Sequence, residues 1–395
     1  MEHCRHSPII DDKLMADPHT AFAQLRKTGP AHHTTTPDGA PVWLVTRYAD
    51  VRAALADPRL SLNKANARTS EHYMSSMPPE LDTHLLNMDP PDHARLRRLV
   101  SRAFTPRHID SLRESVQTTT DDLLDAFTGS RVDLMAALAN PLPMGVICEL
   151  LGIPLDARTD FRAWTSTLLS PTPDAAVDSR AAMRHMHSFL LDIIADKRPR
   201  RTDDLLSAMI EARDEGDRLS EPELVAMAFL ILFAGYDNAV NLIGNAVLAL
   251  LTHPDQMRAV RDGSTTVRAV LEETLRWNSP AELAVRRFAL EDLTIGGVDI
   301  MAGDRVWLSL LSANRDGAQF KAPDTFDPAR TAVHLGFGHG IHYCLGASLA
   351  RLEGEIAITS LLRRFPTLTL AVPADALEWW PNLRKRGLRK LPLTW

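Results

Sequence analysis

The sequence predicts a mainly α-helical protein with a minor β-sheet region. Apolar residues recur at helical spacing through most of the 395 residues, whereas segments with strand character are few and short. One apolar segment, residues 224–251, is far longer than a strand and has almost no polar face, which is typical of a helix buried on all sides. No linker-like stretch separates two halves, so we expect a single domain over residues 1–395, with residues 1–12 as a flexible tail.

The long helix has clear ends in the sequence. Ser220 and Glu223 are spaced as a capping box, and a stop signal, Thr-His-Pro, follows at residues 252–254. Such a helix is roughly 40 Å long at 1.5 Å per residue, enough to cross a whole domain. Asn241 and Asn245 are among its few polar interruptions, and a buried polar side chain is costly unless it is paired or functional.

Shorter elements are expected on both sides of this helix. Helical spacing predicts further helices at residues 47–55, 90–103, 267–277 and 345–364. Short runs bounded by turn signals predict strands at residues 42–46, 293–300, 303–308, 367–372 and 388–393.

Composition and charge argue against several classes of protein. The net charge of -6 is unlike that of a nucleic-acid-binding protein, which is normally basic overall. Three scattered cysteines form no disulfide framework and suit a reducing cytoplasm. The chain starts without a signal peptide, and its most apolar window, residues 224–235, is shorter than the roughly 20 residues of a bilayer span. We therefore expect a cytoplasmic protein that contacts neither nucleic acid nor membrane.

The sharpest chemical signal is the decapeptide at residues 337–346, Phe-Gly-His-Gly-Ile-His-Tyr-Cys-Leu-Gly. Its glycines allow a tight turn and a close approach of the backbone to a flat ligand. Cys344 is expected to open a helix, whose dipole lowers the thiol pKa and favours a thiolate, a suitable axial ligand for haem iron.

Three other interpretations of this decapeptide stay open. The cysteine could be an incidental buried residue beside a glycine turn. A nucleotide-binding glycine loop fits poorly, because the third glycine is missing. A zinc site also fits poorly, because the spacing matches no common pattern; its candidate ligands would be His334, His339, His342 and Cys344.

The decapeptide resembles the cysteine-loop signature of the cytochromes P-450, Phe-Gly-x-Gly-x-x-x-Cys-x-Gly, at every fixed position. The resemblance implies the cytochrome P-450 fold and a bound haem b (iron protoporphyrin IX). It makes Cys344 the ligand of the iron. It also implies haem contacts from Phe337, Gly338 and Gly346.

Further motifs of this family follow in the expected order. Glu273 and Arg276 match its Glu-x-x-Arg motif, a structural pair that locks the meander, here residues 320–330. Arg330 is a candidate third member of this group. Many relatives have an arginine where this chain has Thr325, which leaves the third member open.

The resemblance also implies residues that bind the haem propionates. His93 and Arg97 are four residues apart and share a helix face. His342, two residues before the cysteine, matches a third contact, and Arg287 matches a fourth. Arg286 is the alternative if this register is off by one residue. Arginine and carboxylate form a charge-assisted pair.

The long helix carries Ala-Gly-Tyr-Asp-Asn-Ala at residues 234–239, which resembles the oxygen-activation motif Ala-Gly-x-acid-Thr-Thr of this family. Ala234 and Gly235 would leave room for oxygen and substrate, and Asp237 matches the acid. Asn238 stands where the family has its proton-relaying threonine, and an amide cannot relay a proton through a hydroxyl. We treat these four residues as catalytic candidates.

The family implies a monooxygenase that uses dioxygen and receives electrons from NAD(P)H through ferredoxin reductase and ferredoxin. The ferredoxin would dock on a basic face made by Arg95, Arg98, Arg102, Arg107 and Arg351. The expected substrate is a small apolar organic molecule, oxidised by hydroxylation or epoxidation in the tailoring of secondary metabolites. It would contact segments 63–88, 164–187, 229–235, 281–285 and 379–383. Two alternatives remain: a non-hydroxylating oxidation such as coupling, desaturation or ring formation, suggested by Asn238, and a non-catalytic haem-binding protein.

Overall fold

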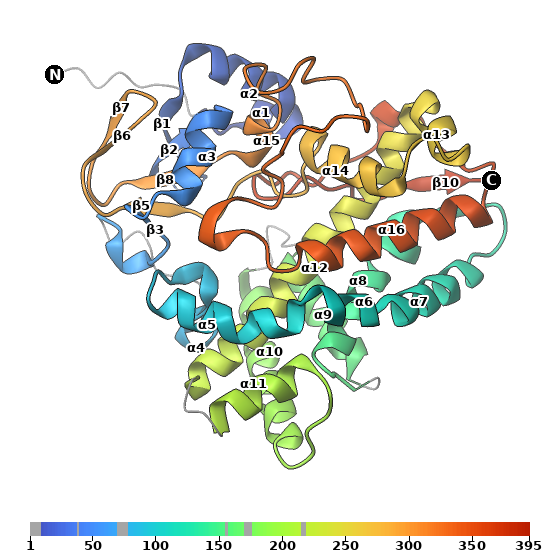
Figure 1. Cartoon of the computed structure of the whole chain (residues 1–395), viewed down its shortest axis with the longest axis horizontal. Coiled ribbons are helices and arrows are strands. Elements are labelled where there is room, and N and C mark those ends of the chain that lie inside the picture. The colour runs from blue at the N-terminus through green and yellow to red at the C-terminus, as the bar shows by residue number, and fades with distance from the viewer. Residues whose placement is uncertain (1–8, 38, 69–77, 155–156, 170–175, 215–218) are drawn as a thin grey trace.

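The computed structural model describes residues 9–37, 39–68, 78–154, 157–169, 176–214 and 219–395. It confirms a mainly helical protein with small sheets (Figure 1). The longer helices surround one central helix, and the largest sheet lies to one side of them, at the upper left of the view. The helices are α1 Asp12–Ala16, α2 Pro18–Thr28, α3 Tyr48–Ala56, α4 Pro79–Asp82, α5 Asp92–Val100, α6 Pro106–Ser111, α7 Arg113–Asp125, α8 Pro141–Leu150, α9 Arg158–Leu169, α10 Ala176–Lys197, α11 Leu205–Asp214, α12 Glu221–Thr252, α13 Pro254–Arg261, α14 Val267–Trp277, α15 Leu310–Ala313 and α16 Ala347–Arg364.

The central helix α12 has the ends that the sequence predicts. Both hydrogen bonds of the capping box between Ser220 and Glu223 are present, and the C-cap is His253. Among the described residues, α12 alone is long and apolar enough to cross a bilayer, but most of its apolar window is buried inside the protein. It packs against α4, α8, α14 and α16, so it is the core helix of the fold.

The strands form three small sheets. The largest has five strands in the order β1-β2-β8-β5-β3, of which only β2 and β8 run parallel. A second has the order β4-β10-β9, and β6 pairs with β7 as a hairpin. Their bounds are β1 Ala31–Thr35, β2 Pro41–Val45, β3 Leu60–Ser61, β4 Arg131–Asp133, β5 Arg287–Ala289, β6 Leu293–Ile295, β7 Val298–Ile300, β8 Arg305–Leu308, β9 Thr369–Leu370 and β10 Pro392–Thr394.

Two sequence predictions need correction here. The expected strand at 293–300 is the β6–β7 hairpin, because Gly296 and Gly297 turn the chain with φ of 59° and 89°. The expected tail over residues 1–12 extends too far. Ile10 is buried in a small apolar cluster, and the side chain of Asp11 caps α1. Residues 1–8 of the predicted tail lie outside the described residues.

The apolar core has a large helical part around α12 and smaller parts around the five-stranded sheet. The loop before α16 lies where the two meet. Its Leu335 belongs to the sheet core, whereas Phe337 and Leu345 pack against the helical core. The cysteine loop is therefore held between the helical core and the sheet core.

Candidate active site

The loop that carries Cys344 is closed by its own backbone. The backbone N–H of Cys344 donates to the carbonyl of Phe337 at 2.9 Å. Gly338 and Gly340 have φ of 74° and 75°, which glycine adopts without strain. A side chain at Gly340 would also approach the carbonyl oxygen of Leu55 to 3.0 Å. Both the turn and the close approach therefore require glycine at this position.

Two expectations about Cys344 are wrong. Helix α16 begins at Ala347, so the cysteine precedes the helix instead of opening it. Burial raises the pKa of the Cys344 thiol, although the backbone N–H of Gly346 and the charges of Arg97 and Arg351 oppose this shift. Burial outweighs these favourable groups. The residue is nevertheless accessible, so it lies deep in the protein but borders open space.

Helix α5 brings two predicted residues against this loop. Arg97 donates from its guanidinium to the carbonyl of Tyr343 at 2.6 Å. The ring of His93 lies 4.2 Å from that of His342, centroid to centroid. Burial lowers the pKa of His342 to about 3, and His93 when protonated and the cations Arg287 and Arg97 act in the same direction. Burial and then Arg97 lower the pKa of His93 as well. Both imidazoles are therefore neutral at pH 7.

Arg287 joins this group from the start of β5. Only 2% of Arg287 is exposed, its guanidinium donates to the carbonyl of Leu55 at 3.2 Å, and burial lowers its pKa to about 10. Arg286, the alternative in the sequence, donates instead to Asn87 at 2.6 Å. The register that places Arg287 beside His342 is the one that the structure has.

Three nitrogen atoms of this group are buried and have no hydrogen-bond partner among the described residues. They are Nε2 of His93, Nδ1 of His342 and Nε of Arg287. Buried polar atoms are nearly always paired, so three orphans in one cluster indicate a site that is completed by a ligand. A ligand bearing carboxylates would satisfy all three, because each nitrogen can donate to an anion.

The middle of α12 is open on one face. Ala234, Gly235 and Asn238 are exposed, although the helix is otherwise buried along most of its length. Asp237 is turned toward the C-terminal segment, where Nζ of Lys385 donates to its Oδ1 at 3.1 Å. Burial raises the pKa of Asp237, and Lys385 opposes this shift. The sequence did not identify Lys385, because no motif surrounds it.

Glu273 and Arg276 form a buried ion pair at 2.7 Å. Arg330 lies 3.5 Å from the same carboxylate, and the backbone N–H of Asp327 donates to it at 2.8 Å. Arg330 is thus the third member, as the sequence suggests. Thr325 contributes its backbone, since its carbonyl accepts from Arg276 at 2.9 Å.

Arg351 is not the free surface charge that the predicted basic face requires. Its guanidinium donates to Glu272 at 2.9 Å and lies 4.5 Å from the ring centroid of Phe337. His334 contacts the same carboxylate at 3.0 Å. Burial raises the pKa of Glu272, but Arg351 and then His334 outweigh it and bring the value to about 2. These contacts fix the start of the cysteine loop.

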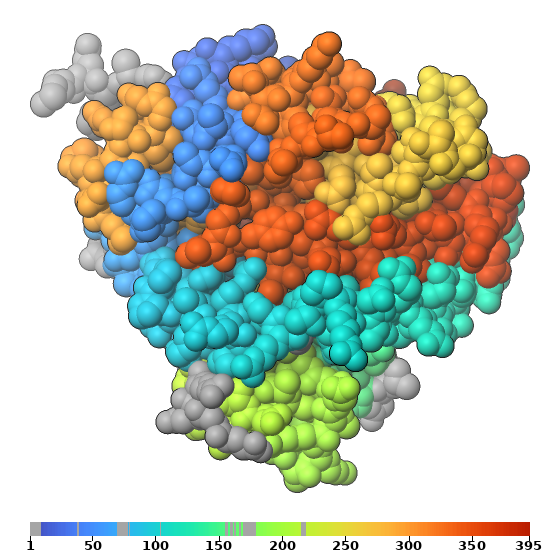
Figure 2. Space-filling model, in the orientation of Figure 1, coloured from blue at the N-terminus to red at the C-terminus, as the bar shows by residue number. Residues whose placement is uncertain are grey.

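Of the other arginines in the predicted basic face, three are exposed and one is paired with carboxylates. Arg95 pairs with Glu223 and Asp92, whereas Arg98, Arg102 and Arg107 are exposed. Figure 2 shows the segment of α5 and α6, in cyan, beside the orange-red segment that leads into α16. In the part of the chain that the structure describes, no group of three or more His, Cys, Asp or Glu side chains could hold a metal ion, which excludes the zinc interpretation there.

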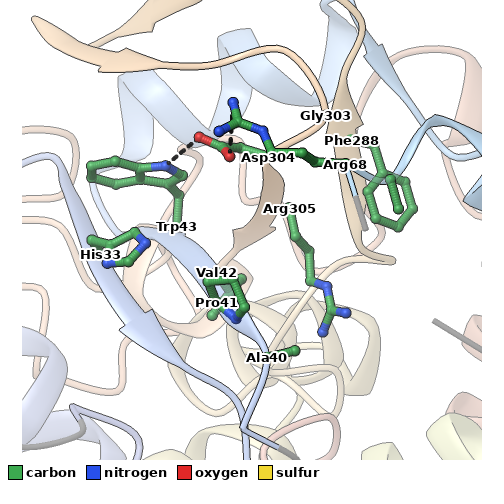
Figure 3. Close-up of a pocket in the computed structure, with 11 residues that line it drawn as sticks. His33, Ala40, Pro41, Val42, Trp43, Arg68, Phe288, Gly303, Asp304 and Arg305 are labelled. Carbon is green, nitrogen blue, oxygen red and sulfur yellow. Dashed lines mark hydrogen bonds and ion pairs between the residues drawn. The ribbon is translucent and has the colours of Figure 1, made fainter. Parts of the chain in front are cut away.

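A separate cavity of about 220 Å³ lies at the five-stranded sheet (Figure 3). Phe288 lines it, and successive side chains of a strand point to opposite faces, so adjacent Arg287 faces away from it. Trp43 donates to Asp304 at 3.1 Å, and Arg68 pairs with the same carboxylate at 3.4 Å. None of the predicted catalytic or haem-binding residues lines this cavity, although Ala67 and Arg68 of the predicted substrate-facing segment 63–88 do.

Comparison with known proteins decides the family. A family model described as Cytochrome P450 matches residues 159–383, more than half of the chain. Cytochrome P450 107B1 of Saccharopolyspora erythraea is 45% identical to it over 396 residues, which cover 97% of this chain and 96% of the relative. The chain belongs to the cytochrome P450 family. It is therefore a P450 monooxygenase, and a P450 is a haem protein.

Two further relatives of this P450 carry information about ligands. Vitamin D(3) 25-hydroxylase of Pseudonocardia autotrophica is 47% identical, with 98% of this chain and 96% of the relative covered. A solved structure of the P450 monooxygenase TamI with tirandamycin C bound superposes with a TM-score of 0.89 at 44% identity, covering 97% of this chain and 98% of that one.

Proposed function

We propose that Cys344 would hold a haem b iron through its sulfur in this P450. The observation that carries the proposal is the convergence beside Cys344 of the three unpaired nitrogens of His93, His342 and Arg287. They match the need of the two propionate carboxylates for donors. Arg97, which links α5 to the cysteine loop, would be the fourth propionate contact.

The residues around the cysteine support both the propionate contacts and the cysteine ligand. An imidazole donates an N–H in its neutral as well as its protonated form, so His93 and His342 can each bind a carboxylate. Arg287 and Arg97 supply the compensating positive charge. Burial disfavours the thiolate form of Cys344, and the backbone N–H of Gly346 and the charges of Arg97 and Arg351 offset part of this cost. Phe337 and Gly338 shape the adjoining wall of the loop.

Haem with a thiolate ligand supplies the activation of dioxygen. The chain's own part lies on α12. Ala234 presents only a methyl group at its open face, which leaves room for oxygen and substrate. At Gly235 the missing side chain makes room for α8, because an added Cβ would stand 2.7 Å from the Ile147 side chain. Asp237 can accept and pass on a proton through its carboxylate. The Asn238 amide can donate and accept hydrogen bonds, so it can hold a water molecule or a polar substrate group in that space.

The substrate that we propose is a mainly apolar organic molecule, oxidised by hydroxylation or epoxidation in the tailoring of a secondary metabolite. The names of its relatives support this class, since one acts on vitamin D(3) and another binds tirandamycin C. The predicted substrate-facing segments 229–235, 281–285 and 379–383 lie within the described residues. Parts of segments 63–88 and 164–187 lie outside them.

We propose further that electrons come from NAD(P)H through ferredoxin reductase and a ferredoxin in the cytoplasm. Arg98, Arg102 and Arg107 are exposed on and beside α5, the helix that contacts the cysteine loop through Arg97. An acidic ferredoxin would be attracted to this face by long-range electrostatics. The attraction weakens with added salt, so electron transfer should slow as ionic strength rises.

The non-hydroxylating oxidation is the second candidate, and the exposed Asn238 is the observation that favours it. If the missing hydroxyl limits proton delivery, Asn238→Thr should raise the amount of hydroxylated product formed per NADPH oxidised. If Asn238→Thr lowers formation of a coupled or desaturated product instead, the second candidate is the correct one.

The test of the haem assignment is the absorption spectrum of the reduced protein under carbon monoxide. Wild type and Cys148→Ser should show a strongly red-shifted Soret band, and Cys344→Ser should lose it. Cys148 is the matched control, because it is a cysteine buried elsewhere in the helical core. Loss of the band in Cys148→Ser alone, or its survival in Cys344→Ser, contradicts the proposal.

A further inference from the structure

The polar interruptions of α12 form one stripe. Asp237, Asn241 and Asn245 are spaced four residues apart and therefore share a face of the helix. The stripe meets the C-terminal segment 378–389 at each position. Nζ of Lys385 donates to Oδ1 of Asp237 at 3.1 Å, and the amide of Asn245 donates to the carbonyl of Arg386 at 3.0 Å.

Between these two contacts, Asn241 lies directly against the backbone of the segment. A Cβ atom added at Gly387 would stand 1.9 Å from Oδ1 of Asn241, so only glycine allows this approach. Asn241 and Asn245 are themselves buried, at 3% and 1% exposure. The two asparagines thus fix how the C-terminal segment is placed along α12. This placement brings Lys385 next to Asp237.

The C-terminal segment is a hairpin that is tied on its other side as well. Within it, the N–H of Trp380 donates to the carbonyl of Gly387 at 2.9 Å. Toward the chain that follows α14, the N–H of Arg386 donates to Pro280 at 2.7 Å, and the N–H of Glu282 donates to Arg384 at 3.2 Å. The backbone on both sides of Lys385 is therefore held.

The Lys385 side chain is buried, at 9% exposure, and its ammonium lies 5.7 Å from the centroid of the Trp380 ring. Burying an ammonium is costly unless a partner compensates it. Asp237 is a carboxylate at hydrogen-bond distance, and among the described residues Lys385 is the charged group that favours its ionised form. The two groups therefore hold each other in place, in the motif where Asn238 replaces the threonine.

We propose that Lys385 is a positioning residue of the oxidation: it holds the carboxylate of Asp237 ionised and oriented, and so sets how that carboxylate takes up and passes on protons. This inference rests on the proposed function, because it assigns Asp237 to proton delivery. It adds the C-terminal hairpin to the parts of the chain that control the chemistry. Asn238 cannot relay a proton through a hydroxyl, so the state of the neighbouring carboxylate matters more here.

The first test reads the carboxyl group itself and needs no turnover. Infrared spectra of the haem-loaded protein are recorded over a pH titration for wild type, Lys385→Met, Lys385→Arg and Arg384→Met. Removing the cation should keep Asp237 protonated to higher pH, so Lys385→Met should gain a carboxylic acid band. Adding Asp237→Asn to the Lys385→Met variant should remove this band, which assigns it to Asp237. Arg384→Met is the matched control, because Arg384 is the adjacent cation and is exposed.

The second test measures NADPH consumption driven by a plant-type ferredoxin and its reductase, in water and in deuterium oxide. The pH profile of Lys385→Met should move to higher pH, and its solvent isotope effect should rise about twofold or more, whereas Lys385→Arg should stay close to wild type. Thermal unfolding and the carbon monoxide spectrum identify any variant that has lost its fold or its haem.

The outcomes separate this inference from the proposed function. If Lys385→Met has normal haem and stability but shows the wild-type acid band, pH profile and isotope effect, Lys385 has no positioning role. Equal changes in Arg384→Met would also overturn the inference, since they would reflect lost surface charge. A wild-type protein without a thiolate-haem spectrum would instead refute the proposed function.

Discussion

The guanidinium of Arg276 donates two hydrogen bonds to the carboxylate of Glu273, from Nε at 2.8 Å and from a terminal nitrogen at 2.7 Å. The remaining donors of Arg276 reach three backbone carbonyls, those of Asn314, Pro323 and Thr325, at 2.7 to 3.0 Å. The pair is therefore the point at which α14 holds the meander that leads to the cysteine loop.

Arg276→Lys should destabilise the protein strongly. A lysine ammonium cannot bridge a carboxylate and three carbonyls at once, so the variant leaves Glu273 buried with a poor partner. Breaking one side of a buried pair typically costs about 3–5 kcal/mol. Urea unfolding measures this loss. The control is Arg258→Lys in the exposed pair with Asp255, which should change stability by less than about 1 kcal/mol. Equal losses in the two variants would contradict this account.

Gly340→Ala and Gly346→Ala should separate backbone strain from space beside the cysteine. Gly340 has φ of 75° and would bring a Cβ within 3.0 Å of the Leu55 carbonyl, so alanine should cost about 1–3 kcal/mol of stability. Gly346 has φ of -82°, and a Cβ there would meet nothing within 4 Å. Gly346→Ala should keep the stability of the haem-free protein and weaken haem binding. Haem titration and thermal unfolding distinguish the two, and a stable Gly340→Ala would refute the strain argument.

Glu353→Gln should make the protein less sensitive to alkaline pH. Glu353 is buried on α16, its Oε2 has no partner among the described residues, and burial raises its pKa from 4.5 to about 8. Between these values the folded state binds more protons than the unfolded state. Stability therefore falls as pH rises through this window, by up to about 1.4 kcal/mol per pH unit for one group.

Urea unfolding at several pH values between 5 and 9 checks this expectation. The slope should decrease in Glu353→Gln and stay unchanged in Glu355→Gln, a matched variant on the same helix whose carboxylate pairs with Arg268 at 3.5 Å. Glu282, whose pKa burial also raises to about 8, should leave part of the slope in both variants. An unchanged slope in Glu353→Gln would show that its carboxyl is already ionised in the folded protein.

The sequence identifies what is local and misses what depends on tertiary contacts. The ends of α12 and α14 are predictable, because caps and apolar spacing are properties of the segment itself. The sequence predicts a lowered pKa for the Cys344 thiol, and this is wrong, because burial is a property of the whole fold and outweighs the nearby N–H of Gly346. Arg351 looks like a surface charge in the sequence, but its partner Glu272 comes from another helix.

Lys385 illustrates the limit most clearly. It lies 148 positions from Asp237, in a segment without a recognisable motif, so nothing local indicates the pair. Helix α12, which carries Asp237, does show a pattern in the sequence. Asp237, Asn241 and Asn245 at four-residue spacing in a buried helix predict a polar element packed along that face. Identifying the element required the structure.

Arg287→Met should weaken haem binding while leaving the haem-free protein at least as stable as wild type. In the described structure Arg287 is a buried cation whose Nε has no partner, and burial lowers its pKa. The contacts of Arg287 with the Leu55 carbonyl and the charge of Asp89 compensate its burial only in part. Replacing such a buried cation by an apolar side chain is often neutral or stabilising. Losing a hydrogen bond to a charged partner costs about 1.5–3 kcal/mol, which is about 10- to 100-fold in the haem dissociation constant.

The control is Arg286→Met, because the Arg286 side chain binds Asn87 instead. This variant should change haem affinity by less than about threefold, below 1 kcal/mol. Haem transfer to an excess of apomyoglobin measures both variants. Equal haem loss from the two, or a less stable haem-free Arg287→Met protein, would mean that Arg287 serves the fold and not the propionates.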